Sequence, residues 1–291
     1  MIFVVIGVII GAMMGSFACC QVRRMRRKEE GSPKLGKWSV CEKCGKRLKK
    51  RENIPVVSWL VQKGKCTKCG ARIGMSEILS EVGLAAIFGI LGYIFCQDFW
   101  QTTLSKVLFG GDAMTIVVWL KLAAWGLMAV AVVLMWMVTI YDAKWGEMPA
   151  KLLWAVVGLA LAIRILMIFI SGVEWFSLLG AVAILPGLYL VLYLISPGKL
   201  VGDGDWVLAL AVALILGDWR LAFFALFLSN AMASVVAVAI VVRDKRKAKK
   251  GKSGPTLGKE MTLRIPFGPY LVLALIVVLL FAPQLQGLIR I

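Results

Sequence analysis

The stretch Leu122–Tyr141, LAAWGLMAVAVVLMWMVTIY, decides how the rest of the chain is interpreted. It is uncharged from end to end, and a run of about 20 apolar residues is long enough to cross a bilayer as one helix. Asp142 follows the run directly. The stretch is therefore typical of a transmembrane helix that carries an acid at its polar end.

Similar runs recur along the whole chain, which is 60% hydrophobic and only 17% charged, whereas a soluble domain usually has about 25% charged residues. We therefore predict an all-α polytopic membrane protein with about eight transmembrane helices. The sixth run is short for a bilayer, so we expect it to begin in a cavity or to pack deep among its neighbours. The expected spans are Ile2–Val22, Ile78–Cys96, Leu122–Tyr141, Leu152–Ile170, Leu178–Ile195, Trp206–Leu216, Leu221–Val242 and Phe267–Phe281. We expect the first to be retained, because it lacks the basic start and small-residue cleavage site of a signal peptide.

The basic residues predict the orientation of these spans. Lys and Arg number 34 against 16 acids, which gives a net charge of +18. Residues 23–75 hold 17 of the basic residues, and residues 243–264 hold another nine. Because basic loops stay on the cytoplasmic side, both segments are predicted inside and both termini outside. The same assignment explains the charge without a nucleic-acid partner and leaves contact with anionic membrane lipid as a smaller role.

Histidine is absent from the chain. A Ser-His-Asp triad, a Cys-His dyad and a zinc protease of the H-E-x-x-H type are therefore excluded. Any hydrolysis must depend on carboxylates, lysine, serine or cysteine.

Four cysteines form two C-x2-C pairs in the first basic segment, a spacing that favours a structural zinc site. A small polar loop gains folding energy from a bound metal, although a redox pair or free thiols is the alternative. The predicted ligands are Cys41, Cys44, Cys66 and Cys69. Cys19, Cys20 and Cys96 lie in spans and are expected to pack as apolar side chains. The expected domains are residues 1–22, a first transmembrane helix; residues 23–76, a cytoplasmic four-cysteine domain; and residues 77–291, a seven-helix membrane domain with the basic loop 243–264.

Two acids stand where spans meet the predicted cytoplasmic side. Asp142 ends the third span, and Asp205 precedes the sixth in Gly202-Asp203-Gly204-Asp205. Carboxylates held close together share a proton, so that one can act as a base and the other as an acid. The alternative is that the acids only mark helix ends, where an Asp near an N-terminus suits the helix dipole.

The order of the motifs resembles the type IV prepilin peptidases, and the likeness extends over nearly the whole chain. The matching residues are Gly15-Ser16-Phe17, the four cysteines, Asn53–Leu60, Glu81, Asp142 with Pro149, Gly202-x-Gly204-Asp205 and Ile265-Pro266-Phe267-Gly268-Pro269. The resemblance implies membrane aspartyl proteolysis by Asp142 and Asp205, with Gly202 and Gly204 supporting the second motif. The chain departs from the family pattern at Cys19, Ala150 and Val207.

What the resemblance implies about partners is equally specific. The substrate is a prepilin or pseudopilin precursor, whose short basic leader ends in Gly before a hydrophobic helix. Cleavage is expected at the cytoplasmic face of a bacterial plasma membrane. Many members also methylate the new N-terminus with S-adenosylmethionine, and Glu81 is the expected donor-binding residue. Two rivals stay open: a transporter or channel with a zinc-ribbon regulatory loop, and a protease that cuts ordinary transmembrane helices.

Overall fold

A computed structural model describes residues 1–31, 39–41, 43–109, 112–172, 174–195, 201–249 and 266–288. Within these residues the regular elements are helices, which confirms the predicted fold class. The chain forms two compact units, Met1–Ile140 and Tyr141–Ile291. Most of the basic loop predicted at 243–264 lies outside the described residues.

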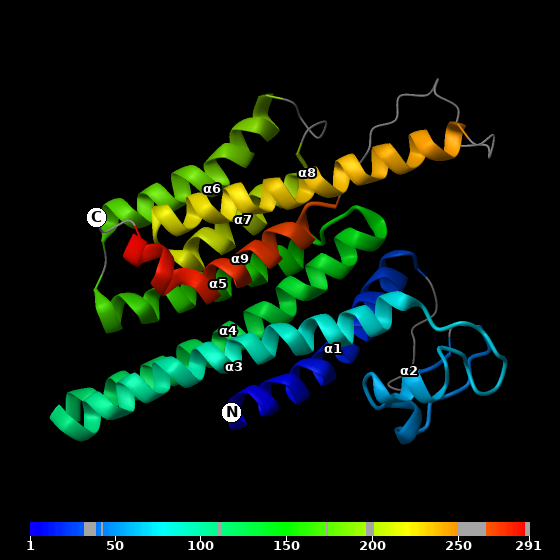
Figure 1. Ribbon diagram of the computed structural model, residues 1–291, viewed down its shortest axis with the longest axis horizontal. Coiled ribbons are helices and arrows are strands. Elements are labelled where there is room, and N and C mark those ends of the chain that lie inside the picture. Colours follow the sequence, from blue (N-terminus) through cyan, green and yellow to red (C-terminus); the bar gives the residue numbers. More distant parts are fainter. Residues whose placement is uncertain are drawn as a thin grey trace. The chain divides into compact units, whose positions relative to one another are not determined.

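The first unit contains α1 (Ile2–Glu29), the short 3₁₀ helix η1 (Lys50–Asn53), α2 (Val57–Val61), α3 (Met75–Phe109) and most of α4 (Asp112–Trp145). The long helices α1 and α3 lie side by side, and the four-cysteine loop connects them (Figure 1). Small residues allow this close approach, as is usual between membrane helices. A Cβ atom at Gly15 would stand 2.6 Å from the Cα of Glu81, and one at Gly7 or Gly11 would overlap a backbone oxygen of α3.

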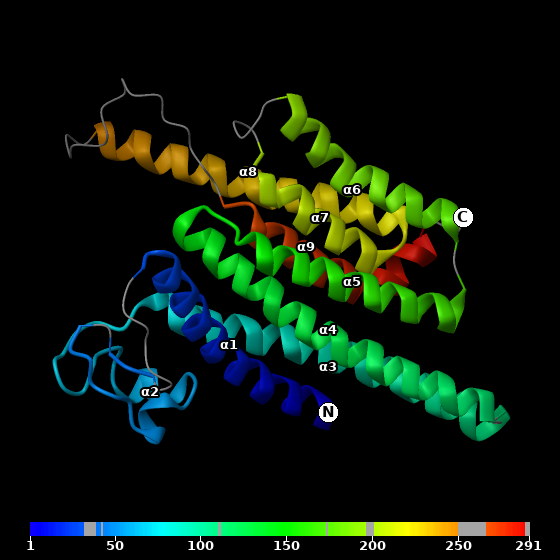
Figure 2. The same cartoon turned by 180° about the vertical axis from the view of Figure 1, so that it is seen from behind.

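The second unit contains the end of α4, together with α5 (Ala150–Ser171), α6 (Trp175–Ile195), α7 (Asp203–Leu216), α8 (Trp219–Lys249) and α9 (Gly268–Leu288). Helix α7 lies among α5, α6, α8 and α9, as both ribbon views show (Figures 1 and 2). Ten of its 14 residues are buried. The core of this unit is therefore built around a short helix.

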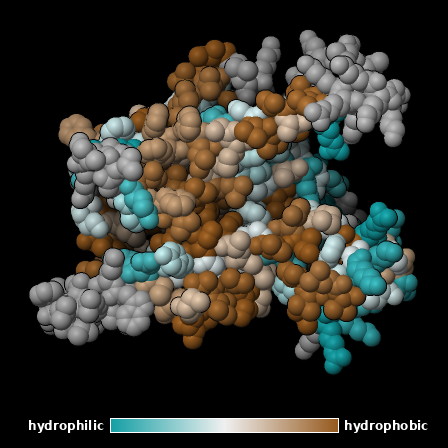
Figure 3. All heavy atoms as spheres, in the orientation of Figure 1, coloured by the Kyte–Doolittle hydropathy of each residue, from teal (hydrophilic) through white to brown (hydrophobic). Residues whose placement is uncertain are grey.

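Seven helices among the described residues are long and apolar enough to cross a membrane. They correspond to seven of the eight predicted spans, the last of which begins one residue before its helix. The remaining one, Trp206–Leu216, is α7, which is too short for a span and packs deep among its neighbours. Large apolar side chains remain exposed on the long helices, and brown surface dominates the visible face (Figure 3). Such a surface suits contact with lipid rather than with water.

Candidate functional site

The predicted acid pair lies within the second unit. Asp142 stands in the last turn of α4 and Asp205 in the first turn of α7. Their exposed fractions are only 5% and 8%. The two carboxyl groups are close enough for their charges to interact. The fold thus brings together two acids that are 63 positions apart in the sequence.

A backbone N–H group holds each of the two carboxylates. The N–H of Gly268 donates to Oδ2 of Asp142 over 2.9 Å, and the N–H of Gly202 donates to Oδ2 of Asp205, also over 2.9 Å. Gly202 is the N-cap of α7, so Asp205 makes the return bond of a capping box. Asp205 therefore stands at a helix N-terminus, as the alternative interpretation of the sequence expected, and the capping bond fixes the orientation of its carboxylate.

Glycines leave little free space around the pair. A Cβ atom at Gly268 would lie 3.0 Å from Oδ2 of Asp142, and one at Gly204 would lie 2.7 Å from the sulfur of Met148. The backbone of α7 therefore approaches the turn after α4 closely, as glycine permits. The motif around Gly268 is visible in the sequence, but nothing local indicates its contact with Asp142. Its position opposite Asp142 depends on a contact over 126 residues, which no local pattern signals.

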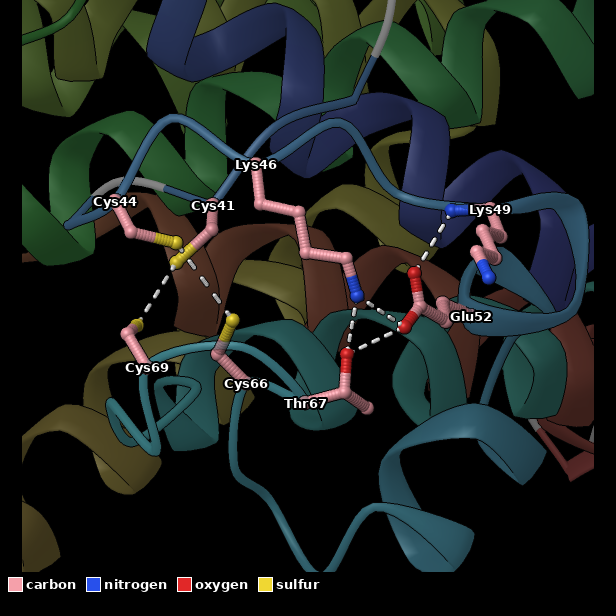
Figure 4. Close-up of polar contacts among 8 residues, drawn as sticks. All are labelled: Cys41, Cys44, Lys46, Lys49, Glu52, Cys66, Thr67 and Cys69. Carbon is pink, nitrogen blue, oxygen red and sulfur yellow. Dashed lines mark hydrogen bonds and ion pairs between the residues drawn. The ribbon is translucent and has the colours of Figure 1, made fainter.

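The four cysteines converge in the loop of the first unit, and their side chains point toward one another (Figure 4). All four sulfur atoms lie within 4.8 Å of each other. The Sγ atoms of Cys41 and Cys69 are 3.8 Å apart, and those of Cys44 and Cys66 are 4.0 Å apart. Tetrahedral zinc with bonds of about 2.3 Å would place sulfurs about 3.8 Å apart, so the donor set fits zinc.

The two C-x2-C pairs have the same local structure. In each pair the glycine after the second cysteine, Gly45 or Gly70, has φ +66 and donates its N–H to the first cysteine's carbonyl. The N–H groups of Cys69 and Lys68 also lower the pKa of the Cys66 thiol to about 6. This stabilises the thiolate, which is the form that binds metal. The glycine after each C-x2-C pair is a further sequence signal of this turn, which the cysteine spacing alone does not include.

Polar contacts join the two pairs independently of any metal. Lys46, beside the first pair, contacts both Glu52 and Thr67, which follows the second pair's first cysteine (Figure 4). The Nζ of Lys46 lies 2.7 Å from Oε1 of Glu52. Hydrogen bonds from Lys46, from the N–H of Lys49 and from Thr67 lower the pKa of Glu52 to about 2. Glu52 is therefore ionised at neutral pH and holds the loop together.

Glu81 of α3 connects the loop with the membrane helices of the same unit. Its exposed fraction is 9%, and its Oε2 accepts the N–H of Val56 over 2.6 Å. Val56 has φ +62, a conformation that a β-branched residue rarely adopts. Strained backbone of this kind clusters at functional sites. The motif Asn53–Leu60 is thus anchored to Glu81.

A cavity of about 220 Å³ opens beside Glu81. Carboxylates, guanidinium groups and an indole line it, including Glu77, Glu81, Arg24, Arg72 and Trp59. The indole Nε1 of Trp59 is buried without a hydrogen-bond partner. Such a lining suits a ligand that carries both charges and an aromatic ring, a description that S-adenosylmethionine fits.

Residues 9–95 match the family model described as the bacterial peptidase A24 N-terminal domain. The chain is 26% identical over 306 residues to the prepilin leader peptidase/N-methyltransferase of Pseudomonas aeruginosa, covering 97% of this chain and 92% of that protein. The proteins of the same name from Stutzerimonas stutzeri and Dichelobacter nodosus are 27% and 28% identical, over 86% of this chain and 73% of each relative. No solved structure matches the chain significantly.

Proposed function

We propose, because the chain belongs to the type IV prepilin peptidase family, that it is a membrane aspartyl endopeptidase which removes the short basic leader from prepilin-like precursors. The observation that carries the proposal is the pair of buried carboxyl groups of Asp142 and Asp205, each held by a backbone N–H. Two acids merely marking helix ends would need neither burial nor mutual proximity.

The two acids would divide the chemistry of hydrolysis between them. The ionised carboxylate takes a proton from water while the water oxygen attacks the scissile carbonyl carbon, and the protonated acid gives its proton to the carbonyl oxygen. When the resulting diol collapses, the C–N bond breaks, the leaving amine takes the proton that the first carboxylate removed from water, and a hydroxyl of the diol returns a proton to the second carboxylate. The bonds from Gly268 and Gly202 keep the carboxylates aligned throughout. Catalytic groups that are held in the correct orientation lower the activation free energy of the reaction.

Mass spectrometry tests this proposal. The purified protein in detergent is incubated with a precursor whose basic leader ends in Gly before an apolar helix. We expect a single cut after that Gly, and no cut in a transmembrane peptide that lacks the leader. Cleavage of both peptides would favour a general intramembrane protease, and cleavage of neither would contradict the proposal.

We also propose that the acid pair and the cysteine loop face the cytoplasm of a bacterial cell. The strong bias of basic residues toward the same loops supports this orientation. Exposed Lys151, close to Asp142 in the sequence, should then be inside, and exposed Glu174, at the other end of α5, should be outside. A cysteine introduced at Glu174 should react in intact cells with a thiol reagent that cannot cross membranes, and one at Lys151 should not. The reverse pattern would exclude cytoplasmic cleavage.

The cysteine loop is proposed to hold one structural zinc ion. Its four sulfur atoms are spaced as tetrahedral zinc requires. The metal would supply folding energy to a loop whose described residues include almost no buried apolar side chain. Elemental analysis of protein purified without chelator should give one zinc per chain.

A second activity, methylation of the amine freed by cleavage, is proposed for the cavity beside Glu81. The printed names of the relatives include this activity, and the charged and aromatic lining of the cavity supports it. S-adenosylmethionine would supply an activated methyl group, so the protein mainly has to align the amine with it. Glu81 is positioned to attract a cationic group, and the Trp59 side chain, which also lines the cavity, offers an aromatic surface.

The methylation proposal is tested on a peptide that already has the mature N-terminus. With the methyl donor present, we expect its mass to increase by one methyl group. Glu81→Gln should abolish this gain while precursor cleavage continues. Unchanged methylation in Glu81→Gln would remove Glu81 from the donor site.

A further inference from the structure

An arginine lies within the apolar helix α5. Arg164 is a costly residue in a predicted membrane span, where ionisable groups usually have a function. Its Nε donates to the carbonyl of Leu214 over 2.7 Å, and its Nη2 donates to the carbonyl of Ile215 over 2.8 Å. Intramembrane arginines are also typical of ion pathways, but both of these bonds end on the backbone of α7.

The carbonyls that Arg164 binds belong to the last turn of α7. This helix has 14 residues, so it is about 21 Å long and shorter than a hydrocarbon core of about 30 Å. A helix of this length that begins at one membrane face, as proposed for the Asp205 end, finishes within the hydrocarbon core. The last carbonyls of a helix lack partners within it, and such groups are expensive to leave unbonded in lipid. A guanidinium satisfies two of them and complements the negative end of the helix dipole.

Gly217 completes the contact. It ends α7 with φ +64, a left-handed conformation typical of a helix C-cap. A Cβ atom at this position would overlap the guanidinium of Arg164. The glycine therefore leaves room for the arginine as well as allowing the turn into α8.

The polar contacts at its two ends determine where α7 lies along its axis. The buried side chains along its flanks are mostly alanine, valine and leucine, whose burial is favourable but not directional. Hydrogen bonds are directional, and at the other end of the same helix stands Asp205. Because an α-helix is stiff over 14 residues, a shift at the Arg164 end moves the carboxylate of Asp205.

We infer that Arg164 is a positioning residue for proteolysis, which holds Asp205 opposite Asp142 by anchoring the far end of α7. The inference rests on the proposed peptidase activity. It assigns no contact between Arg164 and the substrate.

The test compares Arg164→Met with Leu185→Ala. Leu185 is fully buried in α6, and its truncation destabilises the same unit without touching the carbonyls of α7. Cleavage kinetics are measured at a temperature where both variants are folded. We expect Arg164→Met to lower kcat about 10- to 100-fold with KM changed less than about threefold, since small displacements of catalytic groups have effects of this size. Leu185→Ala should keep kcat within about threefold of the original protein.

Two further variants keep the inference testable if Arg164→Met fails to fold. Arg164→Lys retains the charge and one donor group, and we expect it to recover part of the lost kcat. Gly217→Ala displaces the guanidinium and should reduce kcat as Arg164→Met does. Arg220→Gln, at the start of α8, removes an arginine that contacts the Trp219 ring and should leave kcat unchanged.

Hydrogen exchange separates failure of this inference from failure of the proposed function. In Arg164→Met, amides at both ends of α7 should exchange at least about tenfold faster, whereas Leu185→Ala should not change them selectively. Equal losses of kcat in Arg164→Met and Leu185→Ala, or unchanged exchange in α7, would overturn the positioning role. Absence of cleavage by the original protein would contradict the proposed function. The hydrogen-exchange result would then still show whether Arg164 anchors α7.

Discussion

The two units differ in how they hold polar groups next to a membrane. In the first unit, the described part of the polar loop buries few apolar side chains, and the convergent cysteines with Lys46 and Glu52 hold it together. In the second unit, two acids are buried in the protein itself, around a helix most of whose residues are inaccessible. We therefore expect cleavage to survive substitutions in the loop of the first unit, but not substitutions around the acid pair of the second unit.

The largest effect on cleavage is expected when one of the two acids is replaced by its neutral amide. Asp142→Asn and Asp205→Asn should each lower cleavage at least about 1,000-fold, because neither amide can replace an ionised or a protonated carboxyl group. Methylation of a mature peptide should stay within about threefold, since the proposed methyl-donor site lies in the first unit. Precursor and mature peptides are followed by mass spectrometry.

Nearby acids provide the matched controls. Asp203 and Glu147 are exposed neighbours of the pair, and Asp203→Asn and Glu147→Gln should lose less than about fivefold. Cleavage by Asp142→Asn at the original rate would remove that residue from catalysis.

A smaller but more local change is Gly268→Ala. The new methyl group would stand 3.0 Å from Oδ2 of Asp142 and 3.2 Å from the methyl carbon of Met148, so the carboxylate has to move. We expect cleavage to fall about 10- to 100-fold, as displacements of catalytic groups typically cause. The control is Gly158→Ala in α5, where a Cβ atom meets nothing within 4 Å. Equal activity of the two variants would show that the Gly268 contact does not matter.

The membrane-spanning helices and the cysteine cluster could be predicted from the sequence, because their signals are local. Uncharged runs such as Leu122–Tyr141 have the length that a bilayer demands, and the C-x2-C pairs have the spacing that metal sites use. The cysteines converge as predicted. The sixth run was correctly expected to pack deep among its neighbours, because its length was visibly too short.

The remaining features depend on contacts between distant segments. The bond from Gly268 to Asp142 and the bonds from Arg164 to α7 join residues that no periodicity relates. The sequence alone shows Arg164 only as a charge within the expected span Leu152–Ile170. Its partners are backbone carbonyls, and a sequence does not show which carbonyls a helix end leaves unpaired.

Removing a cysteine tests whether the loop of the first unit affects methylation more than cleavage. Cys44→Ser should reduce zinc content and loosen the loop, because the remaining three sulfurs no longer complete a tetrahedral site. We expect methylation to fall about tenfold, since Cys41 and Cys66 line the same cavity as Glu81. Cleavage should fall less than about threefold. Zinc is measured by elemental analysis, and Cys96→Ser, whose thiol lies outside the tetrad, is the control.

The smallest effect on cleavage is expected from Gly11→Ala. Its methyl group would overlap the carbonyl oxygen of Leu84 and lie 2.8 Å from the Cα of Ala85, so α1 and α3 have to separate. Overpacking of this kind typically costs about 1–3 kcal/mol, and the first unit should therefore unfold at a lower temperature in detergent. Gly126→Ala in α4, where a Cβ atom has open space, is the matched control.

Cleavage by Gly11→Ala should stay within about twofold of the original, because the acids and every contact described around them belong to the second unit. Methylation should fall further than cleavage, since Ser16 and Glu81, close to this packing face, line the proposed methyl-donor cavity. The two activities are measured on one preparation, so that differences in folded fraction cancel. A loss of cleavage as large as that of methylation would mean that proteolysis depends on the α1–α3 packing, and the functional division between the units would then be wrong.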